Sequence, residues 1–313
     1  MTYATATARL RRVLPAVTRA RLGGIALLVM LTCCFATLPW SLPRYTQQDL
    51  GVSAADQPPR PPSLAEPMGS DALGRSLVWR LLLGGAVSMT VGLAAAALAV
   101  GIGVTWGLVA GYVGGRLDAL MMRMVDVIYG LPAILLVVMV GLALEPATRS
   151  VARRLLDEAE AVQAAGVTTL WLAIGAVSWL TMSRVIRGQV LSLREQPFVE
   201  AARAVGLSPA RIMARHLLPN LVAPIVVYAT LTVPMAILQE SLLSFLGIGV
   251  RPPLPSWGNL AAEGVSELNL IGGRSHWWLL AFPCIALAVT LLSLNFLGEA
   301  LRARLDPRRL ERA

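Results

Sequence analysis

The chain has 313 residues, of which 56% are hydrophobic and only 14% are charged, and its formal net charge is +9. Soluble domains carry ~25% charged residues, and the apolar residues here form long blocks, so the composition indicates a membrane protein. Every basic residue is Arg. A nucleotide-binding loop of the G-x-x-x-x-G-K-[ST] type requires a Lys, so the sequence excludes a standard ATPase site on this chain.

The first apolar block covers 19 residues from Leu22 to Trp40 and follows five arginines within residues 1–21. A secretory signal peptide has a shorter apolar core and a small-residue cleavage site, so we expect an uncleaved membrane helix here. A Pro-rich segment from Pro43 to Arg80 comes next. Its proline content favours an extended chain, which we expect to form a structured loop on the outer face.

Six stretches without charged residues are long enough to cross a membrane. Every backbone polar group in a bilayer must be satisfied within the segment, so these stretches predict an all-α protein with six transmembrane helices. The first helix lies in an N-terminal region of residues 1–80, five lie in a transmembrane domain of residues 81–300, and residues 301–313 form a cytoplasmic tail. The expected helices cover about residues 22–42, 86–111, 122–144, 166–187, 221–243 and 277–299.

The arginines are distributed unevenly among the segments that connect these helices. If the N-terminus is cytoplasmic, the segments on that side hold 18 of the 27 basic residues but only seven of the 18 acidic residues. This bias predicts that both termini lie in the cytoplasm. The high net charge therefore follows from membrane topology, and no nucleic-acid partner is expected.

Four glycines in the second charge-free stretch, Leu81–Gly115, recur at a strict four-residue interval: Gly103, Gly107, Gly111 and Gly115. Such spacing places a row of missing side chains on one helix face, where a neighbouring backbone can approach closely. We interpret the row as a helix-packing surface. The alternative is that these glycines line a substrate path.

Prolines inside the expected helices include Pro132 in the third and Pro224 and Pro234 in the fifth. Each removes one backbone hydrogen bond and is expected to kink its helix. Kinked helices occur in transporters and in other membrane proteins, so these prolines indicate no function by themselves.

The segment Glu145–Gly166 has apolar residues at intervals of three and four, with charged residues between them. This spacing is typical of an amphipathic helix, which we expect to lie along the outer surface. An alternative role is a docking contact for a partner. The apolar residues are Val151, Leu155, Ala159 and Val162.

Between the fourth and fifth expected helices lies a polar, Arg-rich segment. The spacing predicts two short helices, Glu200–Val205 and Pro209–Leu217, joined at Gly206. A Gly at that position can adopt the left-handed conformation that ends a helix, and Ser208 before Pro209 is typical of the start of the next. We expect Pro219 to mark the return into the membrane. Three apolar residues are available for burial and three arginines face polar surroundings: Leu207, Ile212 and Leu217, and Arg203, Arg211 and Arg215.

These residues resemble the cytoplasmic coupling loop of ABC importer permeases. The matching residues are Glu200, Ala201, Ala202, Gly206, Leu218 and Pro219. His216 stands where the broad family has Ile. Arg215–Asn220 looks like the Arg-His-x-Leu-Pro-Asn of the narrower group of dipeptide, oligopeptide and nickel importer permeases. Further stretches that look like this group are Met68–Arg75, Gly111–Asp118, Ser244–Val250, Pro255–Asn259 and Asn295–Arg308. The segment Glu145–Gly166 departs from the family and looks like an insertion.

The resemblance implies an ABC type I importer permease in the bacterial cytoplasmic (inner) membrane, with membrane lipid around it. It implies a second homologous permease subunit, expected as a heterodimer, two ABC ATPase subunits on the cytoplasmic side and an extracytoplasmic solute-binding protein. It also assigns roles within the coupling loop, residues 190–220. Glu200 would hold the loop at the ATPase surface, Gly206 would set its bend, and Pro219 its junction with the fifth helix.

The resemblance makes di- or oligopeptides the first expectation for the substrate, with nickel chelates, glutathione and opine-like compounds as alternatives. No catalytic residue, cofactor or metal is expected. The only two histidines, His216 and His276, are expected on opposite sides of the membrane and cannot share one metal.

Two other classes of function stay open. Glu240, near the outer end of the fifth expected helix, is costly to bury in a membrane and suits a proton-coupled secondary transporter. A non-transporting membrane scaffold is the third hypothesis, and it predicts no ATPase partner.

Overall fold

The computed structural model describes residues 16–49, 59–64, 66–268 and 275–305. The predicted cytoplasmic tails lie largely outside these residues, and so do parts of the Pro-rich segment. Within the described ranges, six helices are long and apolar enough to cross a membrane, which confirms the all-α, six-helix prediction. They are α2 (Ala16–Ala36), α4 (Leu77–Val113), α6 (Ala133–Ala152), α7 (Glu158–Leu193), the helix Pro209–Phe245 that includes α10 (Leu218–Phe245), and α12 (Trp278–Leu305).

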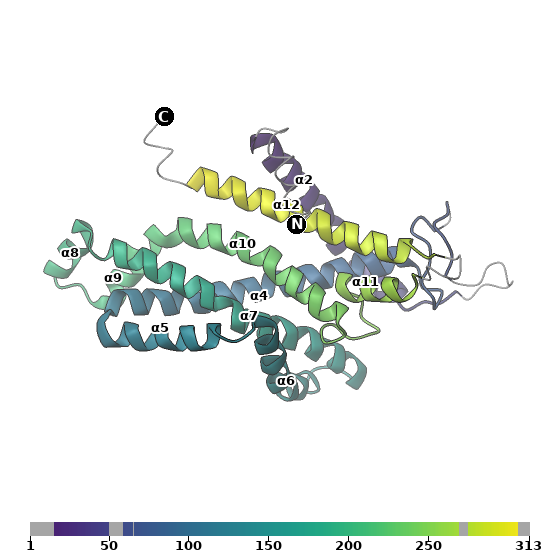
Figure 1. Cartoon of the computed structure of the whole chain (residues 1–313), viewed down its shortest axis with the longest axis horizontal. Coiled ribbons are helices and arrows are strands. Elements are labelled where there is room, and N and C mark those ends of the chain that lie inside the picture. Colours follow the sequence, from purple (N-terminus) through teal and green to yellow (C-terminus); the bar gives the residue numbers. More distant parts are fainter. Residues whose placement is uncertain (1–15, 50–58, 65, 269–274, 306–313) are drawn as a thin grey trace.

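Shorter helices connect or cap the long ones. They are α3 (Leu38–Arg44), α5 (Gly115–Tyr129), α8 (Pro197–Ala204), α9 (Pro209–Ile212) and α11 (Trp257–Ser266). Figure 1 shows α8 and α9 at one end of the long axis and α11 toward the other, and we call these the α8 end and the α11 end.

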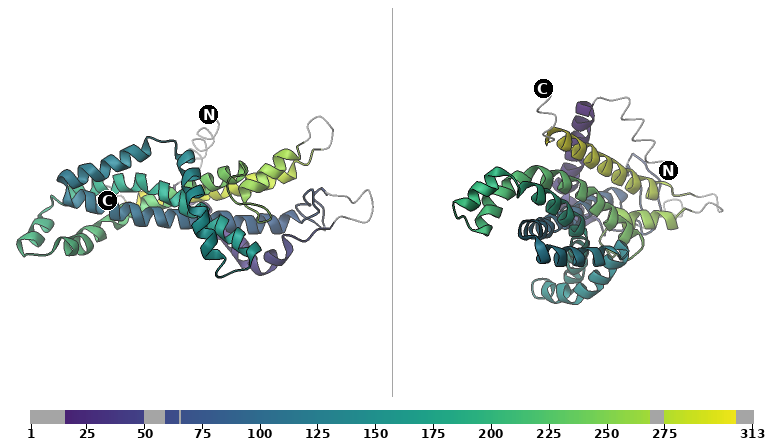
Figure 2. Two further views of the ribbon diagram at one scale, coloured as in Figure 1. Left: turned by 90° about the horizontal axis from the view of Figure 1, so that it is seen from below. Right: turned by 60° about the vertical axis from the view of Figure 1, so that its left-hand side comes forward.

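The long helices α4 and α7 form the central pair, and α10 packs against both. On one side α2 packs against α12, whereas α6 lies on the other side and contacts mainly α7 (Figure 2). Val137 is the one buried residue of α6. The rest of this helix leaves apolar side chains exposed, as a membrane or a partner subunit requires.

The contact between α4 and α7 depends on three of the four predicted glycines. A Cβ atom on Gly107 would lie 2.4 Å from the carbonyl oxygen of Ser183, and Cβ atoms on Gly103 and Gly111 would lie 2.5 Å from Met182 Cβ and 2.8 Å from Val190 Cβ of α7. The absence of side chains lets the two backbones approach. Gly115 does not share this contact, so the prediction was wrong there. It begins α5 with φ +59°, and nothing lies within 4 Å of its Cβ position.

The predicted third helix, about residues 122–144, is wrong because the chain breaks in its middle. After α5 ends, Gly130 and Leu131 form a turn, and Pro132 has φ −58° and ψ 121° before α6 begins. Proline has no N–H and its ring clashes with the carbonyl four residues earlier, so a full break replaces the expected kink. The Arg187 guanidinium holds α5 against α7 through two hydrogen bonds to Asp118, of 2.6 and 2.7 Å.

The predicted amphipathic helix in the segment Glu145–Gly166 is also wrong. The helix α6 continues to Ala152, a short connection follows, and α7 begins at Glu158. The chain reverses inside the supposed helix, so Leu155 is exposed instead of buried. Next to the reversal, the exposed side chain of Glu158 accepts hydrogen bonds from Arg149 (3.1 Å) and Arg153 (2.6 Å).

Two further boundaries differ from expectation. The helix α4 begins at Leu77, so Arg80 belongs to its first turn and not to the Pro-rich loop. Pro43, expected in that loop, lies inside α3. Pro224 and Pro234 lie within α10, which continues through both.

Candidate functional site

The segment expected to form the coupling loop begins with α8, which Gly206 ends. The Gly206 N–H donates to the carbonyl of Arg203 (2.9 Å), and the Leu207 N–H donates to the carbonyl of Ala202 (3.1 Å). This pair of bonds is the Schellman motif, in which the residue after the helix adopts a left-handed conformation. Gly206 has φ +81°, so a residue with a side chain would be strained there.

The second half of the segment differs from the expected hairpin, because it is not separate from the fifth membrane helix. The helix α9 starts at Pro209 after extended Ser208, whose side chain makes no capping hydrogen bond. One π-helical turn, Met213–Leu217, then joins α9 directly to α10. Pro219 lies in the first turn of α10, where the wider π turn avoids the clash that its ring would cause in a regular helix. Residues 209–245 therefore form one rod.

One face of this segment packs into the bundle. Val199 and Ala202 of α8 are buried together with Ile212 and Leu217. They join a cluster that includes Ile186 and side chains from α4 and α10. This apolar contact fixes the position of the segment relative to α4 and α7. Leu207 and Leu218 are half-buried.

Two arginines add polar contacts at the same end. Arg194, which follows α7, donates from Nη1 to the carbonyl of Gly111 at 2.9 Å. The guanidinium of Arg203 lies over the ring of Tyr112, 5.4 Å from its centroid. Arg203 thus ties α8, and Arg194 ties the end of α7, to the last turn of α4. We call α8 and the turn that follows it, residues 197–208, the knob.

The opposite face of the knob is exposed. Glu200, Ala201 and Gly206 are all on this face, and Val205 is 81% exposed. Among the described residues, no hydrogen-bond or ion-pair partner is found for the Glu200 carboxylate. A charged group that has no partner in the described part of the chain and an exposed apolar side chain therefore lie on this face.

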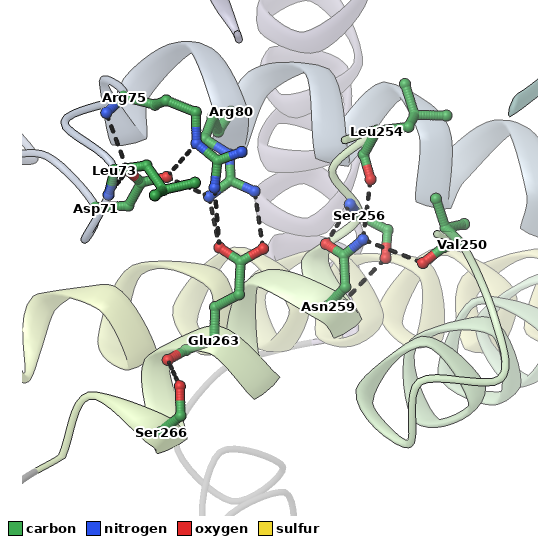
Figure 3. A network of polar contacts seen from close by, with 10 residues as sticks. All are labelled: Asp71, Leu73, Arg75, Arg80, Val250, Leu254, Ser256, Asn259, Glu263 and Ser266. Atoms are coloured by element: carbon green, nitrogen blue, oxygen red, sulfur yellow. Dashed lines mark hydrogen bonds and ion pairs between the residues drawn. The ribbon is translucent and has the colours of Figure 1, made fainter. Parts of the chain in front are cut away.

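At the α11 end, the structure contains a polar network that the sequence did not reveal (Figure 3). Arg80 is 1% exposed and donates to both carboxylate oxygens of Glu263, at 2.5 and 2.9 Å. It also donates to Asp71 at 2.6 Å, and Asp71 accepts from Arg75 at 2.7 Å. The four charges balance, and the network joins the loop before α4, the first turn of α4 and α11.

The start of α11 is fastened to α4 next to this network. The Ser256 hydroxyl accepts from the backbone N–H of Asn259, and the side-chain oxygen Oδ1 of Asn259 accepts from the backbone N–H of Ser256, which forms a capping box (Figure 3). The indole of Trp257 is buried and donates to the carbonyl of Leu81 at 3.1 Å. These hydrogen bonds and the buried indole hold α11 against the start of α4.

Glu240 is fully buried in α10, close to α11. Its carboxylate accepts hydrogen bonds from Ser244 (2.7 Å) and Ser241 (3.2 Å). The Ser244 hydroxyl also accepts the N–H of Val250, which lies in the connection to α11. Hydroxyl groups thus satisfy this carboxyl group, and the contacts link α10 to the chain that follows it.

Known proteins share sequence similarity with most of this chain. The family described as "Binding-protein-dependent transport system inner membrane component" matches residues 103–311. The chain is 35% identical over 294 residues to the oligopeptide transport system permease protein OppC of Haemophilus influenzae, covering 93% of this chain and 85% of the relative. It is 39% identical over 248 residues to the dipeptide transport system permease protein DppC of Bacillus subtilis, covering 79% and 70%.

Solved structures agree on the fold. A chain of the methionine ABC transporter MetNI, in inward-facing conformations, superposes with a TM-score of 0.53. The match covers 73% of this chain and 97% of that chain at 18% identity. At this identity the similarity supports the fold alone.

Proposed function

The chain belongs to the family of binding-protein-dependent transport system inner membrane components, and we propose that it is the permease subunit of an ATP-driven peptide importer. It is a multi-pass protein of the bacterial cytoplasmic membrane. Relatives that share most of its length are named as oligopeptide and dipeptide permeases, which supports peptides as the substrate.

One observation carries the coupling part of the proposal, namely the continuity of α9 with α10. An ATPase subunit that contacts the exposed knob around Glu200 and Val205 acts on a body packed against α4 and α7. The chain continues from α8 through a short turn that includes Ser208 into the continuous helix of residues 209–245. A displacement of the knob therefore moves a membrane helix directly, whereas a flexible loop would absorb it.

The partners follow from this assignment. The α8 end faces the cytoplasm, where two ATPase subunits supply the energy, and each permease subunit receives one of them. A second permease subunit covers the exposed apolar faces of α5, α6 and α10, in a heterodimer. An extracytoplasmic binding protein delivers the substrate to the α11 end.

The rival hypothesis of a proton-coupled transporter depended on Glu240. Because serine hydroxyl groups surround its carboxylate, it has the partners of a structural group. No chain of titratable side chains leads from it to either surface among the hydrogen bonds of the described residues. We assign it to packing between α10 and α11.

The test is reconstitution of the chain in liposomes with its second permease, ATPase subunits and binding protein. Uptake of a labelled dipeptide is expected to require ATP and to survive a protonophore. Uptake by the purified chain alone, or loss of uptake in the protonophore while ATP is intact, would overturn the assignment.

A further inference from the structure

A pocket of about 180 Å³ lies between α6, α7 and the end of α10. Its walls are mostly apolar and include Val137, Leu170 and Leu243, which belong to the buried core of the bundle. Gly141 and Gly249 contribute walls without side chains. The packed core fixes the shape of these walls, so the pocket exists before any ligand binds.

The pocket carries one negative and one positive group. Glu145 of α6 accepts hydrogen bonds from both terminal nitrogens of Arg251, at 3.0 and 3.3 Å. Arg251 lies in the connection between α10 and α11, so the pair joins two separate parts of the fold. The side chain of Arg251 is 59% exposed and that of Glu145 is 31% exposed, so solvent reaches both.

Glu145 lies inside a helix that is long and apolar enough to span the membrane, where burying a carboxylate costs free energy. Charged residues in such helices face cavities and often mark the path of a substrate. An ion pair this exposed contributes little to stability, so a ligand that carries both charges can take the place of either partner at small cost.

We infer that this pocket binds a short peptide with free termini. Arg251 binds the peptide carboxylate, Glu145 binds its ammonium group, and the apolar walls take one side chain. The volume is well below the ~300–1,000 Å³ of pockets for drug-sized ligands, which fits a single side chain. The inference rests on the proposed peptide transport and assigns a substrate site to it.

A photoreactive dipeptide tests the site. Alanyl-photoleucine carries an apolar diazirine side chain and both free termini. It is added to the purified complex of permease and ATPase subunits without binding protein, because the binding protein selects peptides itself. After irradiation, mass spectrometry is expected to find the label on the walls of the pocket, within residues 137–145, 166–173 or 243–251.

The termini are tested by combining protein variants with blocked peptides. Arg251→Ala and a C-terminal amide should each lower labelling by about tenfold, and the two together should lower it no further. Glu145→Ala and N-acetylation should behave in the same way. Arg251→Lys retains the charge and should retain labelling, and Arg154→Ala, in the connection before α7, is the matched control.

The outcomes separate the site from the function. If Arg251→Ala and the amide act additively, or the label falls outside the pocket, the site inference is overturned while peptide uptake by the reconstituted importer still stands. If the reconstituted importer takes up no peptide, the proposed function is overturned, and the site inference that rests on it is overturned as well. If the ion pair is purely structural, Arg251→Ala should lower labelling by free and by blocked peptides to the same extent, and the site inference is overturned.

Discussion

Arg80 and Glu263 are joined by two parallel hydrogen bonds, although 183 residues separate them in the sequence. The pair fastens α11 to the first turn of α4 next to the buried indole of Trp257. The α11 end of the protein is therefore one packed unit.

Glu263→Ala is expected to destabilise the protein because it leaves the buried Arg80 guanidinium with fewer partners. Breaking a fully buried pair costs about 3–5 kcal/mol, and we expect about 2 kcal/mol here, since Glu263 is partly exposed and Asp71 remains. The midpoint of thermal unfolding in detergent measures the loss. Arg153→Ala removes a solvent-exposed pair and serves as control, with no measurable change. Equal midpoints for the two variants would show that the network is not a structural clamp.

Gly107→Ala tests the contact between α4 and α7. The new methyl group meets the carbonyl oxygen of Ser183 at 2.4 Å, so the helices must separate, at a cost of about 1–3 kcal/mol. Gly101→Ala is the matched control in the same helix, because nothing lies within 4 Å of its Cβ position. The midpoint temperature of thermal unfolding should be lower than that of the wild type for Gly107→Ala and equal or higher for Gly101→Ala. The reverse order would contradict the packing role of Gly107.

Gly206→Ala tests the end of α8. The left-handed backbone costs a residue with a Cβ about 1–2 kcal/mol, while the site itself has free space. The strain should reorient the knob and reduce the amount of ATPase subunit that co-purifies, with normal membrane insertion. Gly188→Ala in α7 is the control, since its Cβ also meets nothing within 4 Å. Co-purification of the ATPase subunit at the wild-type level would show that docking does not depend on Gly206.

A bulky side chain on the exposed face tests docking directly. Ala201→Phe leaves the buried face of α8 intact but should prevent close contact with the ATPase subunit. Pull-down of the ATPase with the tagged permease measures the effect. Normal recovery would mean that the partner docks elsewhere.

Local features of the site were predictable from the sequence, because they depend on neighbouring residues. A Gly before a Ser-Pro pair predicts a left-handed helix end, and Gly206 has that conformation. The number of membrane helices also follows from composition. The apolar blocks are long, and each can satisfy its backbone only as a helix.

Features that depend on distant residues were not predictable in this way. Nothing in the sequence near Arg80 shows that Glu263 lies opposite it, since the pairing results from the packing of α11 on α4. The break at Pro132 was missed because a charge-free stretch looks the same whether the chain continues or turns. The fusion of α9 with α10 was missed because Pro219 suggests a helix boundary, whereas a π turn accommodates it.

The most direct test interrupts the rod between the knob and the membrane. Two glycines inserted between Leu217 and Leu218 retain every residue of the knob and of α10 but interrupt the helix that joins them. A matched insertion between Leu155 and Leu156 is the control. The measurement is peptide imported per ATP hydrolysed by the reconstituted complex. We predict continued ATP hydrolysis with import at background for the first variant and a wild-type ratio for the control. A wild-type ratio for both would contradict transmission through the continuous helix.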